Sequence, residues 1–331
     1  MTIFTTLGMF IIDENRYLDI DKPPEINIIG GAGTYAIVGA RIISNSNQAR
    51  EISGIIDKGS DFPIEVEDEI QTWETGVILR NNPTRLTTRG ANLYHNGIRD
   101  FEYLTPKLQI QVDDILQYED LKHSTCFHLI CTIDRCESII DKLNKENPEN
   151  PPIFIYEPLP WDCIHERLDA LKKLLPKIHI FTPNLDEAKL LLGITTTDCD
   201  PNLIAQEFTS FLKIPNSGTV LRCGAGGCLI NTIDGTSIQL PAYHQNQKNV
   251  IDVTGGGNSF CGGFGMGFCL SKGNWLEAGI CGNISSGCVI EKLGMPVVKG
   301  DTFNDKTFRE RLKTYIDQNP SLKVNFDWID V

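Results

Sequence analysis

The residues best able to do chemistry lie in the segment 252–263, which reads Asp-Val-Thr-Gly-Gly-Gly-Asn-Ser-Phe-Cys-Gly-Gly. Gly255, Gly256 and Gly257 stand where a short apolar segment, Val250-Ile251, gives way to an apolar helical run. A helix that begins there points backbone N–H groups and the positive end of its dipole toward one place. Because glycine has no Cβ, a phosphate can approach the main chain closely. The segment therefore predicts an anion-binding helix N-terminus.

A second glycine-rich segment, Gly30–Ala36, contains Gly-x-Gly-x-x-Ala, the fingerprint of a dinucleotide-binding turn. Asp57 ends the next predicted strand, where such a protein carries an acid that binds ribose. An NAD-dependent dehydrogenase is therefore one alternative. Its context is poor, because the fingerprint should close the first strand of the domain, whereas a strand and Pro23-Pro24 precede it here. The commonest structure behind this pattern alone is a packed strand–helix turn.

Two further segments combine polar side chains with turns. Asn184, followed three residues later by Glu187, matches a capping box, and this pattern alone predicts a helix cap. The segment 222–227, Arg-Cys-Gly-Ala-Gly-Gly, predicts a glycine turn after a strand and fits a plain hairpin equally well. A guanidinium at Arg222 could bind a phosphate through two parallel hydrogen bonds.

Taken in order, these motifs resemble those of pfkB/ribokinase-type carbohydrate kinases over nearly the whole chain. Residues 252–258 are similar to the family's second signature, Asp-Thr-Thr-Gly-Ala-Gly-Asp, and residues 183–188 to its element Pro-Asn-x-x-Glu-Ala. Within the family, the chain resembles a divergent fungal branch of the maintenance-of-killer type. The resemblance implies a ribokinase-like three-layer α/β/α sandwich with a mostly parallel central sheet and a small β lid.

The resemblance also implies a role for each matching position. The backbone of the glycine triplet would stabilise the transferring phosphoryl group of ATP, beside the catalytic position Asn258. The substrate would be bound by Asp13, Gly30, Gly31 and Gly33. The nucleotide would be bound by Asn184, Arg222, Gly224, Gly227 and Asn283. Glu187 would hold Mg²⁺ through water, and Asp252 and Thr254 resemble the loop that binds a monovalent cation such as K⁺.

Asn258 departs from the family pattern, because that position carries the Asp that takes the proton of the sugar hydroxyl. An amide oxygen can accept the hydrogen bond of a hydroxyl, but it cannot take the proton at neutral pH. Tyr35 and Ile11 also replace residues that are polar in many sugar kinases. The resemblance thus implies slow, Mg-ATP-dependent phosphorylation of a small hydroxylated substrate. The alternative from another class is a non-catalytic protein that binds nucleotide or sugar and acts through partners.

Composition limits the setting in which this chain acts. Its 331 residues are 41% hydrophobic, and its formal charge is −13. That acidity argues against general nucleic-acid binding, which needs a basic face. Eleven cysteines without a Cys-x-x-Cys motif predict free thiols in a reducing compartment. No basic residue precedes Arg16, and no apolar run is long enough to cross a membrane. We therefore expect a cytoplasmic protein without a membrane span.

Alternating strand-like and helix-like runs predict a mostly parallel sheet with helices on both faces, in one domain over 1–331. The predicted strands are 5–12, 51–57, 126–131, 153–156, 178–181, 220–222, 228–231 and 250–251. The predicted helices are 35–43, 136–143, 164–175, 185–192, 259–271 and 276–293.

The segment 75–103 differs from the rest, since it alternates polar and apolar residues and lacks long apolar runs. It predicts a two-sided antiparallel flap, which with 12–26 would form the lid. An exposed lid edge favours pairing with the lid of a second copy. Four arginines of this segment would attract an anionic substrate if they shared a face, although solvated side chains are the simpler expectation: Arg80, Arg85, Arg89 and Arg99.

Overall fold

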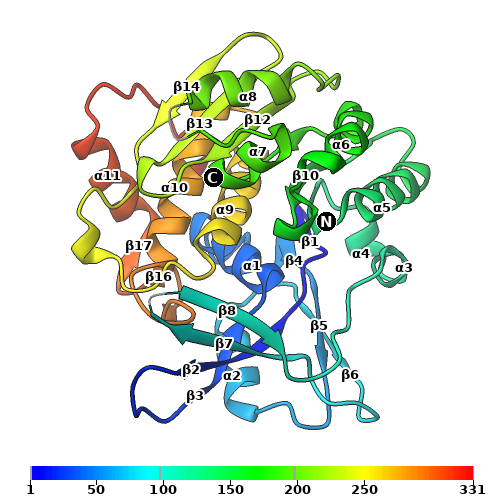
Figure 1. Cartoon of the computed structure of the whole chain (residues 1–331), viewed down its shortest axis with the longest axis vertical. Coiled ribbons are helices and arrows are strands. Elements are labelled where there is room, and N and C mark those ends of the chain that lie inside the picture. Colours follow the sequence, from blue (N-terminus) through cyan, green and yellow to red (C-terminus); the bar gives the residue numbers. More distant parts are fainter. Residues whose placement is uncertain (1, 97, 197–198, 331) are drawn as a thin grey trace.

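The computed structural model describes residues 2–96, 98–196 and 199–330. Its centre is an eight-stranded sheet in the order β14-β13-β12-β11-β10-β9-β1-β4 (Figure 1). Neighbouring strands are parallel from β4 to β12, and β13 and β14 continue the sheet in antiparallel fashion. The strands are β1 (Phe4–Thr6), β4 (Ile52–Ser53), β9 (Cys126–Cys131), β10 (Ile153–Pro158), β11 (Ile180–Phe181), β12 (Gly218–Arg222), β13 (Cys228–Thr232) and β14 (Ser237–Leu240).

Successive side chains of these strands enter two different hydrophobic cores, which makes the fold a three-layer α/β/α sandwich. One core is built on α1 (Ala32–Ile43), α9 (Gly256–Leu270) and α10 (Trp275–Val289), and it receives Phe4, Cys126, Ile155, Ile180 and Val220. The other lies against α5 (Ile133–Glu146), α6 (Leu168–Leu174), α7 (Leu185–Leu192) and α8 (Pro201–Thr209), and it receives Phe127, Phe154, Tyr156, Phe181 and Leu221. Strands buried on both faces explain the continuous apolar runs in the sequence.

A second, four-stranded sheet lies at the lower edge of the view in Figure 1, in the order β3-β2-β7-β8. Its strands are β2 (Ile11–Tyr17), β3 (Glu25–Gly30), β7 (Arg89–His95) and β8 (Ile98–Tyr103). The predicted flap is therefore present, but β2 pairs with β7 in parallel rather than antiparallel fashion. β6 (Ile78–Asn81) is not part of this sheet and pairs instead with β5 (Ile55–Lys58).

The chain passes from the central sheet to the four-stranded sheet at a tight crossing. A Cβ added to Gly8 would lie 2.5 Å from the backbone nitrogen of Gly33, and a Cβ on Gly33 would lie 2.2 Å from the carbonyl oxygen of Gly8. Only glycine at both positions allows the end of β1 and the first turn of α1 to touch. This contact, which we call the Gly8–Gly33 crossing, fixes where the chain leaves β1 toward β2 and where it enters α1 from β3.

Three arginines of the predicted basic face are held by neighbours on this part of the molecule. Arg80 pairs with Asp57 at 2.8 Å, and Arg89 pairs with Asp61 at 2.6 Å. Arg85 donates to the carbonyl oxygen of Pro106 at 2.6 Å. The side chain of Arg99 lies outside the described residues. The charges of Arg80 and Arg89 are therefore already paired with carboxylates, which argues against a basic face for anionic substrates at these two positions.

Other elements differ from the sequence predictions in ways that have physical reasons. Residues 5–12 are two strands, because the chain leaves one sheet at Leu7 and enters another at Ile11. Residues 250–251 form no strand, and Ile251 is 66% exposed. The helix predicted over 164–175 is shorter in the structure, because a 3₁₀ turn precedes it and another follows it. Elements that were not predicted include α8, β14 and α11 (Phe308–Gln318).

The remaining helices are short. They are α2 (Ile64–Thr72), α3 (Val112–Ile115) and α4 (Glu119–Lys122). A small three-stranded sheet near the C-terminus comprises β15 (Val298–Lys299), β16 (Thr302–Phe303) and β17 (Lys306–Thr307). None of the described helices has both the length and the apolar character needed to cross a membrane. All eleven cysteines are free thiols, as the sequence predicted.

Candidate active site

A cavity of about 290 Å³ lies where β11 and β12 end and α9 begins. Its walls come from segments far apart in the sequence. Among the predicted site residues it brings together Asn184, Arg222, Gly224, Gly227, Gly256, Gly257 and Asn283. Ligands of open α/β sheets bind beyond the carboxyl ends of the strands, and this cavity occupies that place.

The predicted anion-binding turn is the N-terminus of α9. The helix begins at Gly256, and its cap residue Gly255 has φ 75°, in the left-handed region that favours glycine. No acidic side chain lies in the first turn of this helix. The free N–H groups of the first turn and the helix dipole therefore make this end of the cavity attractive to an anion.

Asn184 and Glu187 form the predicted capping box at the start of α7. The Glu187 backbone N–H donates to Asn184 Oδ1 at 2.8 Å, and the Asn184 backbone N–H donates to Glu187 Oε2, also at 2.8 Å. Burial raises the pKa of Glu187, although the nearby Arg222 acts in the opposite direction. The capping function is thus confirmed, and the role of Glu187 toward Mg²⁺ stays a prediction.

Arg222 lies buried at the base of the cavity and already holds several acceptors. Its Nη1 is 2.8 Å from Glu157 Oε1, and its Nη2 is 3.5 Å from Glu187 Oε2. Nη2 also donates to the backbone oxygen of Thr182 at 3.1 Å. Burial opposes the charge of Arg222, but Glu157 and Glu187 raise its pKa. Two-point binding of a phosphate by Arg222 stays a prediction, because a ligand would share the guanidinium with these carboxylates.

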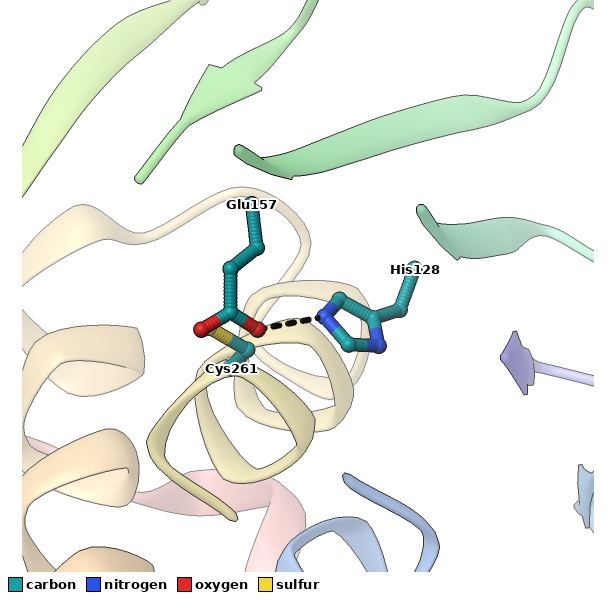
Figure 2. A group of neighbouring side chains, drawn as sticks. All are labelled: His128, Glu157 and Cys261. Carbon is teal, nitrogen blue, oxygen red and sulfur yellow. Dashed lines mark hydrogen bonds and ion pairs between the residues drawn. The ribbon is translucent and has the colours of Figure 1, made fainter. Parts of the chain in front are cut away.

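Glu157 is the main residue of the site that sequence reasoning missed. It is 4% exposed at the end of β10, and it accepts hydrogen bonds from His128 Nε2 at 3.1 Å and from Asn258 Nδ2 at 2.9 Å. Figure 2 shows Glu157 and His128 pointing toward each other, with Cys261 beside them. Burial alone would raise the pKa of Glu157, but Arg222, His128 and Asn258 hold it at about 2. The carboxylate is therefore ionised at neutral pH.

Strand register explains why Glu157 and His128 meet. In the parallel pair β9–β10, His128 stands opposite Ile155, and Glu157 is two residues farther along the same face. A carboxylate placed directly after an apolar strand of a parallel sheet was the available signal, since such strand ends line the ligand-binding edge. His128 itself stands inside an apolar run, and nothing local in the sequence marks it.

The predicted substrate residues lie around the N-terminus of α1. Asp13 is 5% exposed, and a Cβ on Gly30 would lie 2.0 Å from Asp13 Oδ2. Burial and the charge of Asp13 raise the pKa of Tyr103, which places these two groups near each other. Gly31 caps α1 with φ 92°, and Gly33 forms the Gly8–Gly33 crossing. Both glycines thus have structural reasons to be glycine, and substrate binding by these residues stays a prediction.

The dinucleotide fingerprint does not occur in the context that it requires. The strand before it, β3, belongs to the four-stranded sheet, so the fingerprint does not close a strand of the parallel sheet. The turn is the packed strand–helix junction that the pattern alone favoured.

The remaining predicted residues hold local structure around the cavity. Asp252 Oδ1 accepts a hydrogen bond from the Thr254 backbone N–H at 3.0 Å, which shapes the loop before α9. Asn283 Nδ2 donates to Cys228 Sγ at 3.4 Å. The loop after β14 adds Tyr243 and His244 to the cavity wall, although no sequence motif marks either residue. Cation binding at Asp252 and Thr254 stays a prediction.

Comparisons with known proteins indicate the family of this chain. Residues 107–296 match the pfkB family of carbohydrate kinases. Protein MAK32 of Saccharomyces cerevisiae, a fungal relative as the resemblance implied, is 38% identical over 343 residues, covering 96% of this chain and 93% of that protein. Adenosine kinase of the same yeast is 25% identical over 220 residues, covering 65% of this chain and 60% of that enzyme.

Solved structures support the fold. The structure of a putative ribokinase II from E. coli, in complex with ATP and Mg²⁺, superposes with a TM-score of 0.70. It is 17% identical in sequence and covers 96% of this chain and 100% of that one. The predicted ribokinase-like α/β/α sandwich is therefore confirmed.

Proposed function

This chain belongs to the pfkB family of carbohydrate kinases, and we propose that it binds Mg-ATP and slowly transfers the γ-phosphoryl group to a hydroxyl of a small sugar or nucleoside. The products are ADP and a phosphate ester. The hydroxyl proton leaves to water, because Asn258 can accept its hydrogen bond but cannot keep it. Positioning and charge stabilisation still assist the transfer, since phosphoryl-transfer transition states are loose.

The observation that carries this proposal is the convergence of four distant segments on one cavity. The start of α7, the β12–β13 turn, the N-terminus of α9 and Asn283 of α10 all contribute to its wall. The glycines of the turn and of α9 allow a triphosphate to approach the backbone. Glu187 would hold the hydrated Mg²⁺ from the edge of this site, which suits a cation that keeps most of its waters.

Nucleotide binding is tested by thermal shift and calorimetry with Mg-ATP, Mg-ADP and NAD. A ligand that binds only the folded state raises the melting temperature. Ala225 is an exposed residue of the cavity wall, so Ala225→Glu adds a like charge at little cost in packing. The matched control Ala225→Gln adds similar bulk without charge. We expect Ala225→Glu to weaken ATP binding more than Ala225→Gln does. Stabilisation by NAD but not by ATP at millimolar concentration would contradict the proposal.

A second candidate function is favoured by the contact between Asn258 and Glu157. The amide that replaces the family's base is tied to a buried carboxylate, which suits a site that binds ligands without turning them over. In that case the protein would act through partners. ATP binding without phosphoryl transfer to any sugar or nucleoside would favour this candidate.

Three narrower proposals follow from the family and the sequence. A monovalent cation such as K⁺ would bind near Asp252 and Thr254 and raise ATP affinity relative to Na⁺. The four-stranded sheet would pair with that of a second copy, which light scattering after gel filtration would detect as a dimer. The protein would act in the cytoplasm, which fluorescence microscopy of a tagged chain in a fungal cell would test.

A further inference from the structure

The contact between Asn258 and Glu157 fixes the orientation of the Asn258 amide. Glu157 is ionised and can only accept hydrogen bonds, so Nδ2 and not Oδ1 must face it. Oδ1 is then directed away from the carboxylate and can accept a hydrogen bond from another group. Asn258 is only partly buried, whereas Glu157 is almost wholly enclosed. A ligand can therefore reach position 258 but not position 157.

Glu157 is itself held from several elements. Arg222 of β12 binds Oε1, and His128 of β9 donates to Oε2. His128 Nδ1 lies 3.0 Å from Thr6 Oγ1, which fixes the imidazole from its other side. With Nε2 facing the carboxylate, Nδ1 and the Thr6 hydroxyl form the next hydrogen bond. A continuous buried chain of hydrogen bonds thus runs from Thr6 to Asn258.

The same cluster has the residue types of a metal site, but its charges argue against one. Ligand atoms of His128, Glu157 and Cys261 lie within 4.8 Å of one another. Arg222 already occupies one oxygen of Glu157, so a divalent cation would sit beside a guanidinium. Burial also raises the pKa of Cys261 well above its ordinary value, which keeps the thiol protonated. The charges of this cluster therefore suit the positioning of Asn258 rather than the binding of a metal ion.

We propose that Glu157 is the positioning residue for Asn258, and that the site carries its negative charge at position 157 and its amide at position 258, so that a base appears at 258 only when both residues are exchanged. This inference rests on the proposed function. It adds a residue, Glu157, that decides whether position 258 can take a proton from the acceptor hydroxyl.

Changing Asn258 alone should therefore fail. Asn258→Asp places a second carboxylate oxygen about where Nδ2 stood, 2.9 Å from Glu157 Oε2. Two carboxylates so close cannot both ionise at neutral pH, so one must hold a proton. Arg222 and His128 favour the charged form of Glu157, and the charge of Glu187 also acts on this group of residues. The proton then resides on the new Asp, which is blocked as a base until the pH exceeds its raised pKa.

The double variant Glu157→Gln/Asn258→Asp conserves the net charge and keeps the same hydrogen-bonded pairs of residues. Gln Oε1 accepts from Arg222, and Gln Nε2 donates to the new Asp and to His128. In this variant His128 Nδ1 donates to the Thr6 hydroxyl oxygen. The carboxylate then stands on the partly exposed helix end, where a hydroxyl can reach it.

The positioning half of the proposal is tested on the whole chain by a thermal-unfolding cycle of wild type, both single variants and the double variant, without ligand. We expect both single variants to melt several degrees below wild type. Asn258→Asp puts two carboxyl groups in contact, and Glu157→Gln removes the carboxylate that Arg222 contacts at 2.8 Å. The double variant should melt closer to wild type than either one. Additive losses in the double variant would overturn the coupling of Glu157 to Asn258.

The catalytic half is tested by ADP release with ribose and adenosine as acceptor probes, between pH 5.5 and 8.5. We expect the double variant to transfer about 10²-fold faster than wild type, the lower range for general-base catalysis, with little dependence on pH. Asn258→Asp alone should approach that rate only at the high-pH end. Identical pH profiles for the single and double variants would overturn the role of Glu157.

The positioning of Asn258 by Glu157 and the restoration of a base at position 258 can fail separately. Recovery of stability in the double variant, with ATP bound but neither probe phosphorylated, would confirm the positioning of Asn258 and overturn its restoration as a base. Failure of all four proteins to bind ATP would instead contradict the proposed function, while the unfolding cycle would still decide the pairing.

Discussion

Tyr35 of α1 lies directly against Gly255, the cap residue of α9. A Cβ added to Gly255 would stand 2.2 Å from Cδ1 of the Tyr35 ring, which is itself buried. Gly255 also has φ 75°. The N-terminus of α9 is thus shaped by a side chain from α1, so the predicted nucleotide and substrate segments are in contact at this point.

Gly255→Ala is expected to destabilise the protein strongly. The left-handed backbone costs a non-glycine residue about 1–2 kcal/mol, and overpacking against Tyr35 adds about 1–3 kcal/mol. Gly224→Ala is the matched control, because Gly224 also has positive φ but an added Cβ there meets nothing within 4 Å. Urea denaturation measures both. Equal losses for the two variants would mean that the Tyr35 contact carries no energetic weight.

Glu157 should make the free energy of unfolding depend on pH in the acid range. Its folded pKa of about 2 lies below the ordinary value of 4.5, so its contribution is present above pH 4.5 and is lost as pH falls toward 2. Glu157→Gln should flatten the dependence of the unfolding free energy on pH in this range by up to about 1.4 kcal/mol per pH unit. Chemical denaturation at several pH values measures the slope.

Glu187→Gln serves as a control of opposite sign. The folded pKa of Glu187 is raised by burial, so the folded state holds more protons just above pH 4.5 and stability falls with rising pH there. Gln keeps the capping box and removes this fall. A slope change of the same sign in both variants would contradict the opposite directions of the two pKa shifts.

Asn184 should separate capping from ligand binding. Asn184→Ala removes the acceptor for the Glu187 backbone N–H and should cost about 1 kcal/mol in unfolding free energy. Asn184→Ser keeps a capping oxygen and should retain stability. If the amide also serves the Mg-ATP site, Asn184→Ser will lower ATP affinity in calorimetry while the melting temperature stays near wild type. Unchanged affinity in a stable Asn184→Ser variant would leave Asn184 a cap alone.

Arg80 and Arg89 should affect stability rather than substrate choice. Both guanidiniums are partly buried and paired with carboxylates, so Arg80→Met and Arg89→Met leave Asp57 and Asp61 without their partners. We expect a lower melting temperature for each and no selective loss of binding to phosphorylated over neutral sugars. A selective loss for phosphorylated sugars would restore the idea of a basic substrate face.

Local patterns predicted the elements whose signals are local. The strand Cys126–Cys131 and the helix Leu185–Leu192 have the predicted bounds, because an apolar run and a capping box mark them. Residues 250–251 were predicted as a strand from apolar character alone. A strand needs a neighbour to pair with, and none of the strands of the described chain pairs with this segment.

The motif residues of the cavity were predicted from the family resemblance, but the network beneath them was not. His128, Glu157 and Asn258 are separated by 29 and 101 positions, and only the register of β9 with β10 and the packing of α9 bring them together. The identity of residue 258 shows only that an amide stands where the family has its base. The structure adds a carboxylate, Glu157, one hydrogen bond away.

The Gly8–Gly33 crossing has a mechanical consequence. β2 begins and β3 ends close to this crossing, while the turn between the two strands carries the exposed Leu18 and Ile20 at the far end. A sheet clamped at one end behaves as a cantilever, so its displacement grows with distance from the clamp. Bending would carry this turn far while Asp13 and Gly30, close to the crossing, stay nearly still.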